Sequence, residues 1–331
     1  MKLNKNIKIF LNYFLGPVLF VWLSLSIYRQ IKAQPDLELS WQRIKDTLNS
    51  TAIWKPITVV LLMFMNWSVE TFKWKLAVRP VQTISFFTAL KAVLSGVSFS
   101  VTTPNRTGEY LGRILYMDEG NRLRTISLTI LCSISQLIIT VLAGFIGLVC
   151  LRGRIIRSDI FQGWSMIWVQ VFLYGTLVFL FILTLFYFRL SLFAKWLDRL
   201  PKSEKYSYLI RELEAIDATL LLKLLSLSAI RFFVFMLQYY LLFAFFDVGL
   251  DWWQCFWSVS LTFLILAAIP SFALIDLGIR GEVSLKVVSL FSANAIGIGF
   301  TTATVWFVNL IIPALTGSLL ILGIKIFKKK K

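Results

Sequence analysis

Hydrophobic residues are concentrated in eight long blocks of this chain, and most of the blocks are separated by charged connectors. The blocks cover residues 10–28, 53–69, 84–101, 126–150, 163–188, 219–246, 253–269 and 296–324. Each holds about 17 residues or more, and a helix of about 20 apolar residues crosses the roughly 30 Å hydrocarbon core of a bilayer. The sequence therefore predicts an all-α polytopic membrane protein in which residues 1–331 form a single integral membrane domain.

The first block resembles a signal peptide because three lysines precede it. However, Tyr28-Arg29-Gln30 is not a small-residue cleavage site, and the block is long enough to span, so we expect an uncleaved first helix. The chain has no histidine, and its three cysteines are far apart. Without imidazoles or a metal-ligand spacing, we expect no metal site and no cofactor.

The basic residues indicate how the blocks lie in the membrane. The chain carries 34 Lys+Arg against 17 Asp+Glu, and its charge fits basic loops facing an anionic cytoplasmic leaflet better than a nucleic acid. If all eight blocks span, 14 basic loop residues lie inside and 17 outside. If 84–101 and 253–269 are arms of re-entrant hairpins, 21 lie inside and 10 outside. The second arrangement obeys the positive-inside rule, and it predicts about six spanning helices with both termini cytoplasmic.

The hairpin arrangement also predicts an inverted repeat. A first pseudo-repeat covers residues 53–150 with a hairpin at 84–120, and a second covers 219–324 with a hairpin at 253–292 entering from the opposite side. Transporters with such repeats hold their site near the membrane midplane. Residues 189–217 separate the two halves and have apolar residues on one helical face among basic ones. This pattern is typical of an amphipathic cytoplasmic connector on anionic lipid.

The two hairpin tips are alike in sequence. The first reads Thr103-Pro104-Asn105-Arg106-Thr107-Gly108-Glu109, and the second contains Pro270 and then Asp276-Leu277-Gly278-Ile279-Arg280-Gly281-Glu282. Thr103 and Asp276 are expected to cap the returning helices, whose N-terminal N–H groups would then favour an anion. The candidate headgroup ligands are Arg106, Glu109, Arg113, Asp276, Arg280 and Glu282, and the candidate tip backbone residues are Pro104, Gly108, Pro270, Gly278 and Gly281.

These residues also allow a structural interpretation. A Gly-Glu pair beside an arginine can be an ion pair that holds a helix–loop junction, and the stretch from Arg106 to Arg124 can be a solvated basic loop. Lys91, Arg231 and Asn309 lie within apolar blocks, where they either line the site or pair structurally. Six polar positions, Asn309 among them, are expected to form interhelical hydrogen bonds, and two glycines to allow close packing. These are Asn66, Glu70, Gln136, Gln238, Asn294 and Asn309, and Gly144 and Gly147.

Both motifs, continued on the first side by Tyr110-Leu111-Gly112-Arg113, resemble the transmembrane region of the lysylphosphatidylglycerol synthase / flippase-like family. The closing run from Trp306 to Gly323 also looks like that family's last helix. In its best-known members this region resembles a translocator of an aminoacylated phospholipid and is fused to a soluble aminoacyl-transferase domain. This chain ends at Lys331, soon after its last block, so we expect no such transferase in it.

The residues and the resemblance together predict a non-enzymatic lipid translocator of a bacterial cytoplasmic membrane. Its partners would be membrane lipids with an anionic or lipid-linked headgroup. Two alternatives stay open. The chain could be an intramembrane enzyme acting on lipid headgroups with Glu109 or Glu282 as base, although no nucleophile is paired with a base. It could also be a non-catalytic partner of a separate transferase that docks on 189–217.

Overall fold

The described part of the chain is entirely helical in its regular elements. The structure is a computed structural model and describes Leu25 and residues 51–101, 103, 107–158, 166–189, 216–269 and 273–322. Within these ranges every regular element is a helix, so the all-α prediction is confirmed. Apart from Leu25, the predicted first span, 10–28, lies outside the described residues, as does nearly all of the connector 189–217.

Four helices are long and apolar enough to cross a membrane, and they match four predicted blocks. They are α7 (Arg122–Arg157), α8 (Met166–Phe188), α11 (Ala218–Phe245) and the continuous helix over Ala295–Ile321. The last of these consists of α14 (Ala295–Trp306), a π-helical stretch η5 (Phe307–Ile311) and α15 (Ile312–Leu322). The side chain of Asn294 begins it by accepting a hydrogen bond from the Gly297 N–H at 2.9 Å.

The helix that begins the first predicted repeat is longer and more polar than its apolar block. After a short 3₁₀ turn η1 (Thr51–Ile53), α4 runs over Trp54–Val78, nine residues beyond the predicted block 53–69. The extension contains Lys73, which the predicted block 53–69 leaves in the charged connector that follows it. That placement is wrong, because Lys73 is 1% exposed and packs inside the bundle.

Two pairs of shorter helices pack as helical hairpins in the regions where re-entrant hairpins were predicted. In the first pair, α5 (Phe86–Val101) packs on α6 (Gly108–Ile114). In the second, α12 (Trp252–Ala268) packs on α13 (Ala273–Val288). A capping box starts α12, since the Asp251 side chain accepts from the Gln254 N–H while the Gln254 side chain accepts from the Asp251 N–H.

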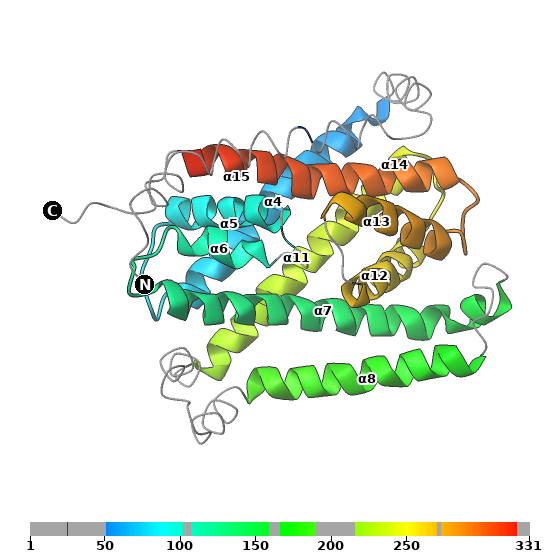
Figure 1. Cartoon of the computed structure of the whole chain (residues 1–331). Coiled ribbons are helices and arrows are strands. Elements are labelled where there is room, and N and C mark those ends of the chain that lie inside the picture. Colours follow the sequence, from blue (N-terminus) through cyan, green and yellow to red (C-terminus); the bar gives the residue numbers. More distant parts are fainter. Residues whose placement is uncertain are drawn as a thin grey trace.

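Each hairpin packs on the last helix of the other half. Helix α5 contacts α15 and α6 contacts α7, whereas α12 contacts α7 and α13 contacts α14. In Figure 1 the hairpins accordingly lie in opposite halves of the molecule, between α7 and the long helix α14–α15. The packing pairs of the two halves correspond: α5 on α15 corresponds to α12 on α7, and α6 on α7 corresponds to α13 on α14. The first helices of the two halves, α4 and α11, pack on each other.

Glycines allow the two long helices to approach the hairpin arms closely. A Cβ at Gly144 of α7 would lie 2.4 Å from the Leu264 Cβ on α12, and one at Gly317 of α15 would lie 2.0 Å from the Leu94 carbonyl oxygen on α5. Next to the second contact, the Ser98 hydroxyl donates to the Ala314 carbonyl. The close-packing role expected for Gly144 is therefore confirmed.

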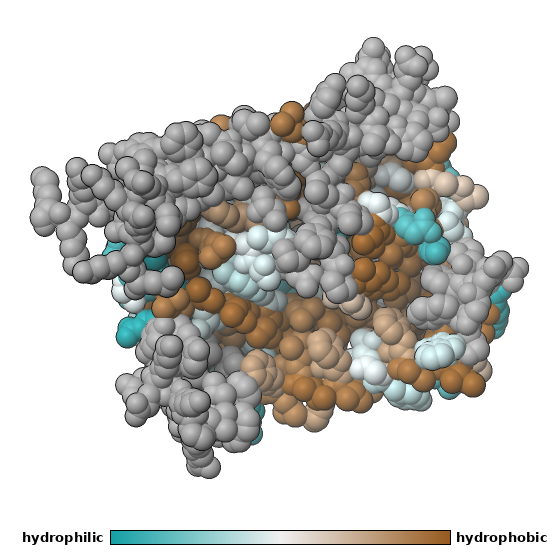
Figure 2. Space-filling model, in the orientation of Figure 1, coloured by the Kyte–Doolittle hydropathy of each residue, from teal (hydrophilic) through white to brown (hydrophobic). Residues whose placement is uncertain are grey.

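The largest hydrophobic cluster lies where α4 and α11 meet, and it includes Met63, Met236 and Phe243. On the face shown in Figure 2, hydrophobic residues predominate over α7 and α8, and the most hydrophilic described residues lie mostly near the ends of the long helices. Helix α8 is the most exposed of the four long helices, with only a ninth of its apolar window buried. This distribution is what a bilayer environment requires.

Candidate functional site

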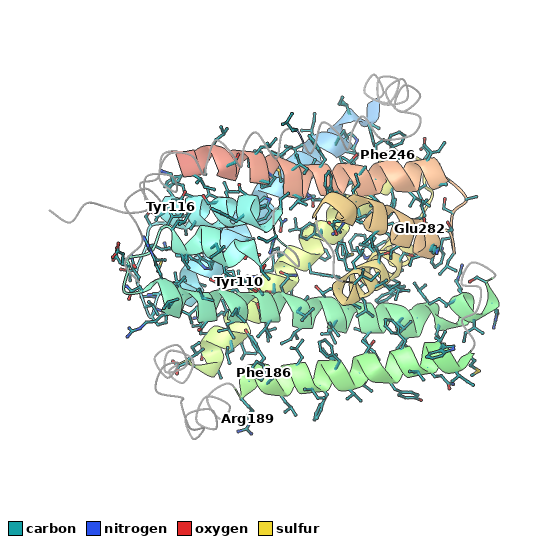
Figure 3. The ribbon with its side chains drawn as sticks, viewed as in Figure 1. Tyr110, Tyr116, Phe186, Arg189, Phe246 and Glu282 are labelled. Carbon is teal, nitrogen blue, oxygen red and sulfur yellow. The ribbon has the colours of Figure 1, made fainter. Side chains whose placement is uncertain are left out.

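A cavity of about 620 Å³ lies at the centre of the bundle, and the ends of both hairpins line it. The first hairpin contributes Ser100 from the end of α5 and Glu109 and Tyr110 from the start of α6; the second contributes Ile269 and then Asp276 and Arg280 of α13. Figure 3 shows Tyr110 near the middle of the molecule. The remaining walls come from α4, α7, α11 and the α14–η5 segment.

The first tip is closed by a threonine and a glycine. The Thr103 hydroxyl donates to the Phe99 carbonyl at 3.2 Å and accepts from the Gly108 N–H at 2.6 Å. A Cβ at Gly108 would lie 2.2 Å from the Phe99 carbonyl oxygen, so only glycine fits there without movement. The expectation that α6 starts directly after Thr103 is wrong: α6 begins at Gly108, and Pro104 and Arg106 lie outside the described residues.

Glu70 of α4 is the hub of a buried ion cluster behind this tip. Its carboxylate pairs with Lys73 at 2.8 Å, with Arg113 of α6 at 2.7 Å and with Arg231 of α11 at 2.7 Å. Arg113 also pairs with Glu109 one turn earlier. Buried ions persist only when they are paired and hydrogen-bonded, so these pairs hold α4, α6 and α11 together.

Arg113 and Arg231 take different positions in this cluster. Arg113 is 1% exposed and lies behind the cavity wall, with its guanidinium directed at Glu70 and Glu109. Arg231 lines the cavity, donates from Nε to Asn66 Oδ1 at 2.8 Å, and lies over the rings of Trp67 and Phe235.

A chain of amides continues the cluster toward the other half of the molecule. Asn66 donates to Asn309 Oδ1 at 3.1 Å, Asn309 donates to Gln238 Oε1 at 2.9 Å, and Gln238 donates to the Val59 carbonyl at 3.0 Å. The interhelical hydrogen bonds predicted for these three amides are confirmed. Asn309 lies in the π-helical stretch η5 and lines the cavity, and π-helical turns occur frequently at functional sites.

The second tip carries its own ion pair within one helix. Arg280 donates to Asp276 at 3.3 Å, one turn away on α13, and lies 6.0 Å from the centre of the Phe263 ring. Asp276 is not the helix cap that we expected, because α13 begins three residues earlier at Ala273. Pro270 lies outside the described residues.

The other predicted residues of the second motif lie away from the cavity. Glu282 is exposed and pairs with the exposed Lys286 at 3.2 Å, and Figure 3 shows it farther along α13. A Cβ at Gly278 or Gly281 would meet no described atom within 4 Å. On the first hairpin, Lys91 is exposed on α5 and is not among the cavity-lining residues.

The sequence interpretation missed several cavity residues. Glu70 was assigned only to interhelical bonding and Lys73 to a loop, although their three-residue spacing already predicts neighbours on one helical face. Trp67, Trp306 and Gln136 also line the cavity. Over the described ranges, no group of three or more His, Cys, Asp or Glu side chains is placed to hold a metal ion.

Four long apolar helices and two hairpins that meet at a charged central cavity define a multi-pass helical membrane protein. The family model named lysylphosphatidylglycerol synthase TM region matches residues 13–317. The chain belongs to this family, as its two tip motifs predicted. No curated protein matches the chain.

Proposed function

We propose that this protein is a lipid translocator of a bacterial cytoplasmic membrane, with both termini cytoplasmic, and that it moves a phospholipid or lipid-linked headgroup between leaflets without changing it chemically. One observation carries the proposal: the ends of the two hairpins line the same charged cavity. In this proposal the headgroup enters the cavity while the acyl chains stay in the bilayer. The family, whose name refers to a lipid synthase, supports a lipid-related role.

The hairpins support access from both faces of the membrane. Helix α5 has 16 residues and α12 has 17, so they reach roughly 24 to 26 Å, short of the roughly 30 Å hydrocarbon core. Each is followed by a helix that packs back on it. We infer that both hairpins are re-entrant and dip in from opposite faces, as in transporters built from inverted repeats.

Cavity polarity supports a headgroup rather than an acyl chain as the occupant. Asp276, Arg280 and Arg231 are charged groups at membrane depth, where ionisable side chains mark substrate pathways. An arginine that contacts a phosphate contributes about 1.5 to 3 kcal/mol through charge-assisted hydrogen bonds. Such contacts lower the barrier that a polar headgroup meets in hydrocarbon.

A leaflet-resolved assay in proteoliposomes tests the proposal. Phospholipids labelled on an acyl chain are placed in one leaflet, and their transfer is followed by quenching from outside. Arg280→Ala should slow the transfer about 10-fold or more, as expected for losing 1.5 kcal/mol or more of headgroup binding.

The matched control is Lys286→Ala, which removes an exposed base from the same helix α13 and should leave the transfer rate unchanged. If every anionic or glycosylated lipid tested crosses as fast with Arg280→Ala as with the unmodified protein, headgroup binding at the tips is refuted.

A further inference from the structure

The cavity is lined by two chemically different groups of residues, and together they define a class of headgroup. We propose that it selects a monoanionic phosphodiester headgroup that carries hydroxyl groups, and that it discriminates against headgroups that carry an amine. This inference rests on the proposed function, because it names the substrate class of the same cavity. Three features support it: the charge balance of the cluster, one incompletely bonded arginine, and a row of neutral acceptors on α7.

The first feature is the excess charge of the buried cluster. Among the described residues in and behind the cavity, the basic side chains are Lys73, Arg113, Arg231 and Arg280, and the acidic ones are Glu70, Glu109 and Asp276. Four basic groups against three acidic ones leave a formal charge of +1. A bound monoanion neutralises this excess, whereas a zwitterion leaves it uncompensated at membrane depth, where uncompensated charge is costly.

The second feature is the Nη2 group of the Arg231 guanidinium. Its Nε donates to Asn66 and its Nη1 to Glu70, while its Nη2 makes no hydrogen bond to the described residues. The side chain lines the cavity, remains 14% exposed and lies 5.2 Å from the centre of the Trp67 ring. Because these contacts fix the guanidinium, its remaining N–H donors are oriented for a phosphate oxygen.

The indole N–H groups of the cavity add further donors. Trp306 is 7% exposed, and its Nε1 has no hydrogen-bond partner among the described residues; the same holds for the Nε1 of Trp67. An indole N–H can only donate. Both residues line the cavity on the side of α4 and α14, so this side offers donors to an oxygen-rich anion.

The third feature is a row of neutral polar residues on α7. Ser133, Gln136 and Thr140 of α7 line the cavity, and their spacing of three and four residues places them on one helical face. The Ser133 hydroxyl donates to the Thr129 carbonyl at 3.2 Å, and the Thr140 hydroxyl donates to the Gln136 carbonyl at 2.9 Å. Both hydroxyl protons are therefore used, and the oxygens are left as acceptors.

Gln136 completes this acceptor wall. Its Oε1 is buried and has no partner among the described residues, so a ligand donor would satisfy an otherwise costly polar atom. A hydroxyl group matches these uncharged acceptors. An ammonium group is matched less well, because each acidic side chain that the structure describes near the cavity is already paired with a guanidinium.

The size of the cavity fits such a headgroup. Its volume of about 620 Å³ lies within the 300 to 1,000 Å³ range of small-molecule pockets, which is ample for a phosphate with a polyol. The arginine and indole side would hold the phosphate, and the α7 row would hold the hydroxyl groups.

Binding of soluble short-chain lipids to the purified full-length protein tests the inference separately from transport. Four dioctanoyl lipids are compared by competition: phosphatidylglycerol, phosphatidylinositol, phosphatidylmethanol, which has the same charge but no hydroxyl, and phosphatidylethanolamine, which carries an amine. We expect the two hydroxyl-bearing lipids to bind about 5- to 30-fold more tightly than phosphatidylmethanol, as one or two hydrogen bonds of about 1 kcal/mol would give. Phosphatidylethanolamine should bind more weakly than phosphatidylglycerol by 10-fold or more.

Variants of α7 locate the effect. Gln136→Leu should lower the affinity for phosphatidylglycerol to about that for phosphatidylmethanol, and the nearly isosteric Gln136→Glu should shift the preference toward phosphatidylethanolamine. Cys150→Ser, at an exposed position of the same helix, is the control and should change neither affinity.

The inference is overturned if phosphatidylethanolamine or phosphatidylmethanol binds to the unmodified protein as tightly as phosphatidylglycerol. Selective binding without transfer in proteoliposomes would refute the translocator function but keep the headgroup class. Transfer of all four lipids without selective binding would refute the headgroup class but keep the translocator function.

Discussion

The two hairpins of this protein occupy equivalent places in the packing pattern but are held by different means. The first tip is fixed to the scaffold, because Arg113 of α6 pairs with Glu70 of α4, and because Thr103 and Gly108 close its turn. The ion pair of the second tip, Asp276 with Arg280, lies within a single helix.

This difference indicates that two hairpins with equivalent helix packing can differ in how far they move. A tip tied to α4 and α11 by a buried ion cluster moves only with those helices, whereas the Asp276–Arg280 ion pair lies within α13 and stays intact when α13 moves as a unit. We expect the first hairpin to be the fixed wall of the cavity and the second hairpin to be the part that adapts to the headgroup.

The largest effect should come from removing the Glu70 carboxylate, which anchors the first hairpin to α4. Glu70→Gln leaves Lys73, Arg113 and Arg231 buried without their shared carboxylate, and breaking a buried pair costs about 3 to 5 kcal/mol. Thermal unfolding in detergent should show a large loss of stability or no folded protein.

The control for this variant is Glu282→Gln, which breaks only an exposed pair on α13 and should change the stability by about 0.5 kcal/mol or less. Equal melting temperatures for the two variants would show that the first hairpin is not anchored by the cluster.

Glycine substitutions give a second, smaller contrast. Gly108→Ala places a Cβ 2.2 Å from a backbone oxygen of α5 and should destabilise the protein by about 1 to 3 kcal/mol. Gly278→Ala on α13 meets no described atom within 4 Å, so it should be neutral or stabilising by up to about 1 kcal/mol, the helix-propensity gain. The same unfolding assay measures both, and a comparable loss at Gly278 would contradict the proposed difference between the tips.

The smallest expected effect concerns the Thr103 hydroxyl. Thr103→Val keeps the shape of the side chain but leaves the Gly108 N–H without its acceptor, which should cost about 1 kcal/mol. Thr103→Ser retains the hydroxyl and should preserve most of the stability. Hydrogen exchange of the Gly108 amide gives a local reading, with faster exchange expected only in the valine variant.

Much of the fold could be predicted because the position and length of an apolar block indicate directly where a membrane helix lies. The blocks 219–246 and 253–269 agree with α11 and α12 to within one residue at each end. The end of α4 could not be predicted in this way, because the helix continues in polar sequence and hydropathy alone cannot distinguish a buried Lys73 from a loop lysine. It also placed the start of α6 too early, because Thr103-Pro104 matches a cap pattern that this turn does not use.

The site was only partly predictable, for a physical reason. The two motifs led to Glu109, Asp276 and Arg280, which line the cavity. The role of Glu70 depends on Arg113 and Arg231, which are 43 and 161 residues away in the chain, so no local pattern contains it. Gln136 and Trp306 belong to no sequence motif, and only the arrangement of α7 and α14 in the folded protein shows that they line the same cavity.

The exchange of hairpins between the halves has a consequence for biogenesis. Helix α5 packs on α15, and Ser98 meets Ala314 at a separation of 216 residues. At 5 to 20 residues per second, roughly 10 to 40 s pass between the synthesis of these two partners. During that interval the surface of α5 that later receives Gly317 must be covered by lipid, by the insertion machinery or by a temporary neighbour, so the packing around α5 becomes complete only when α15 arrives.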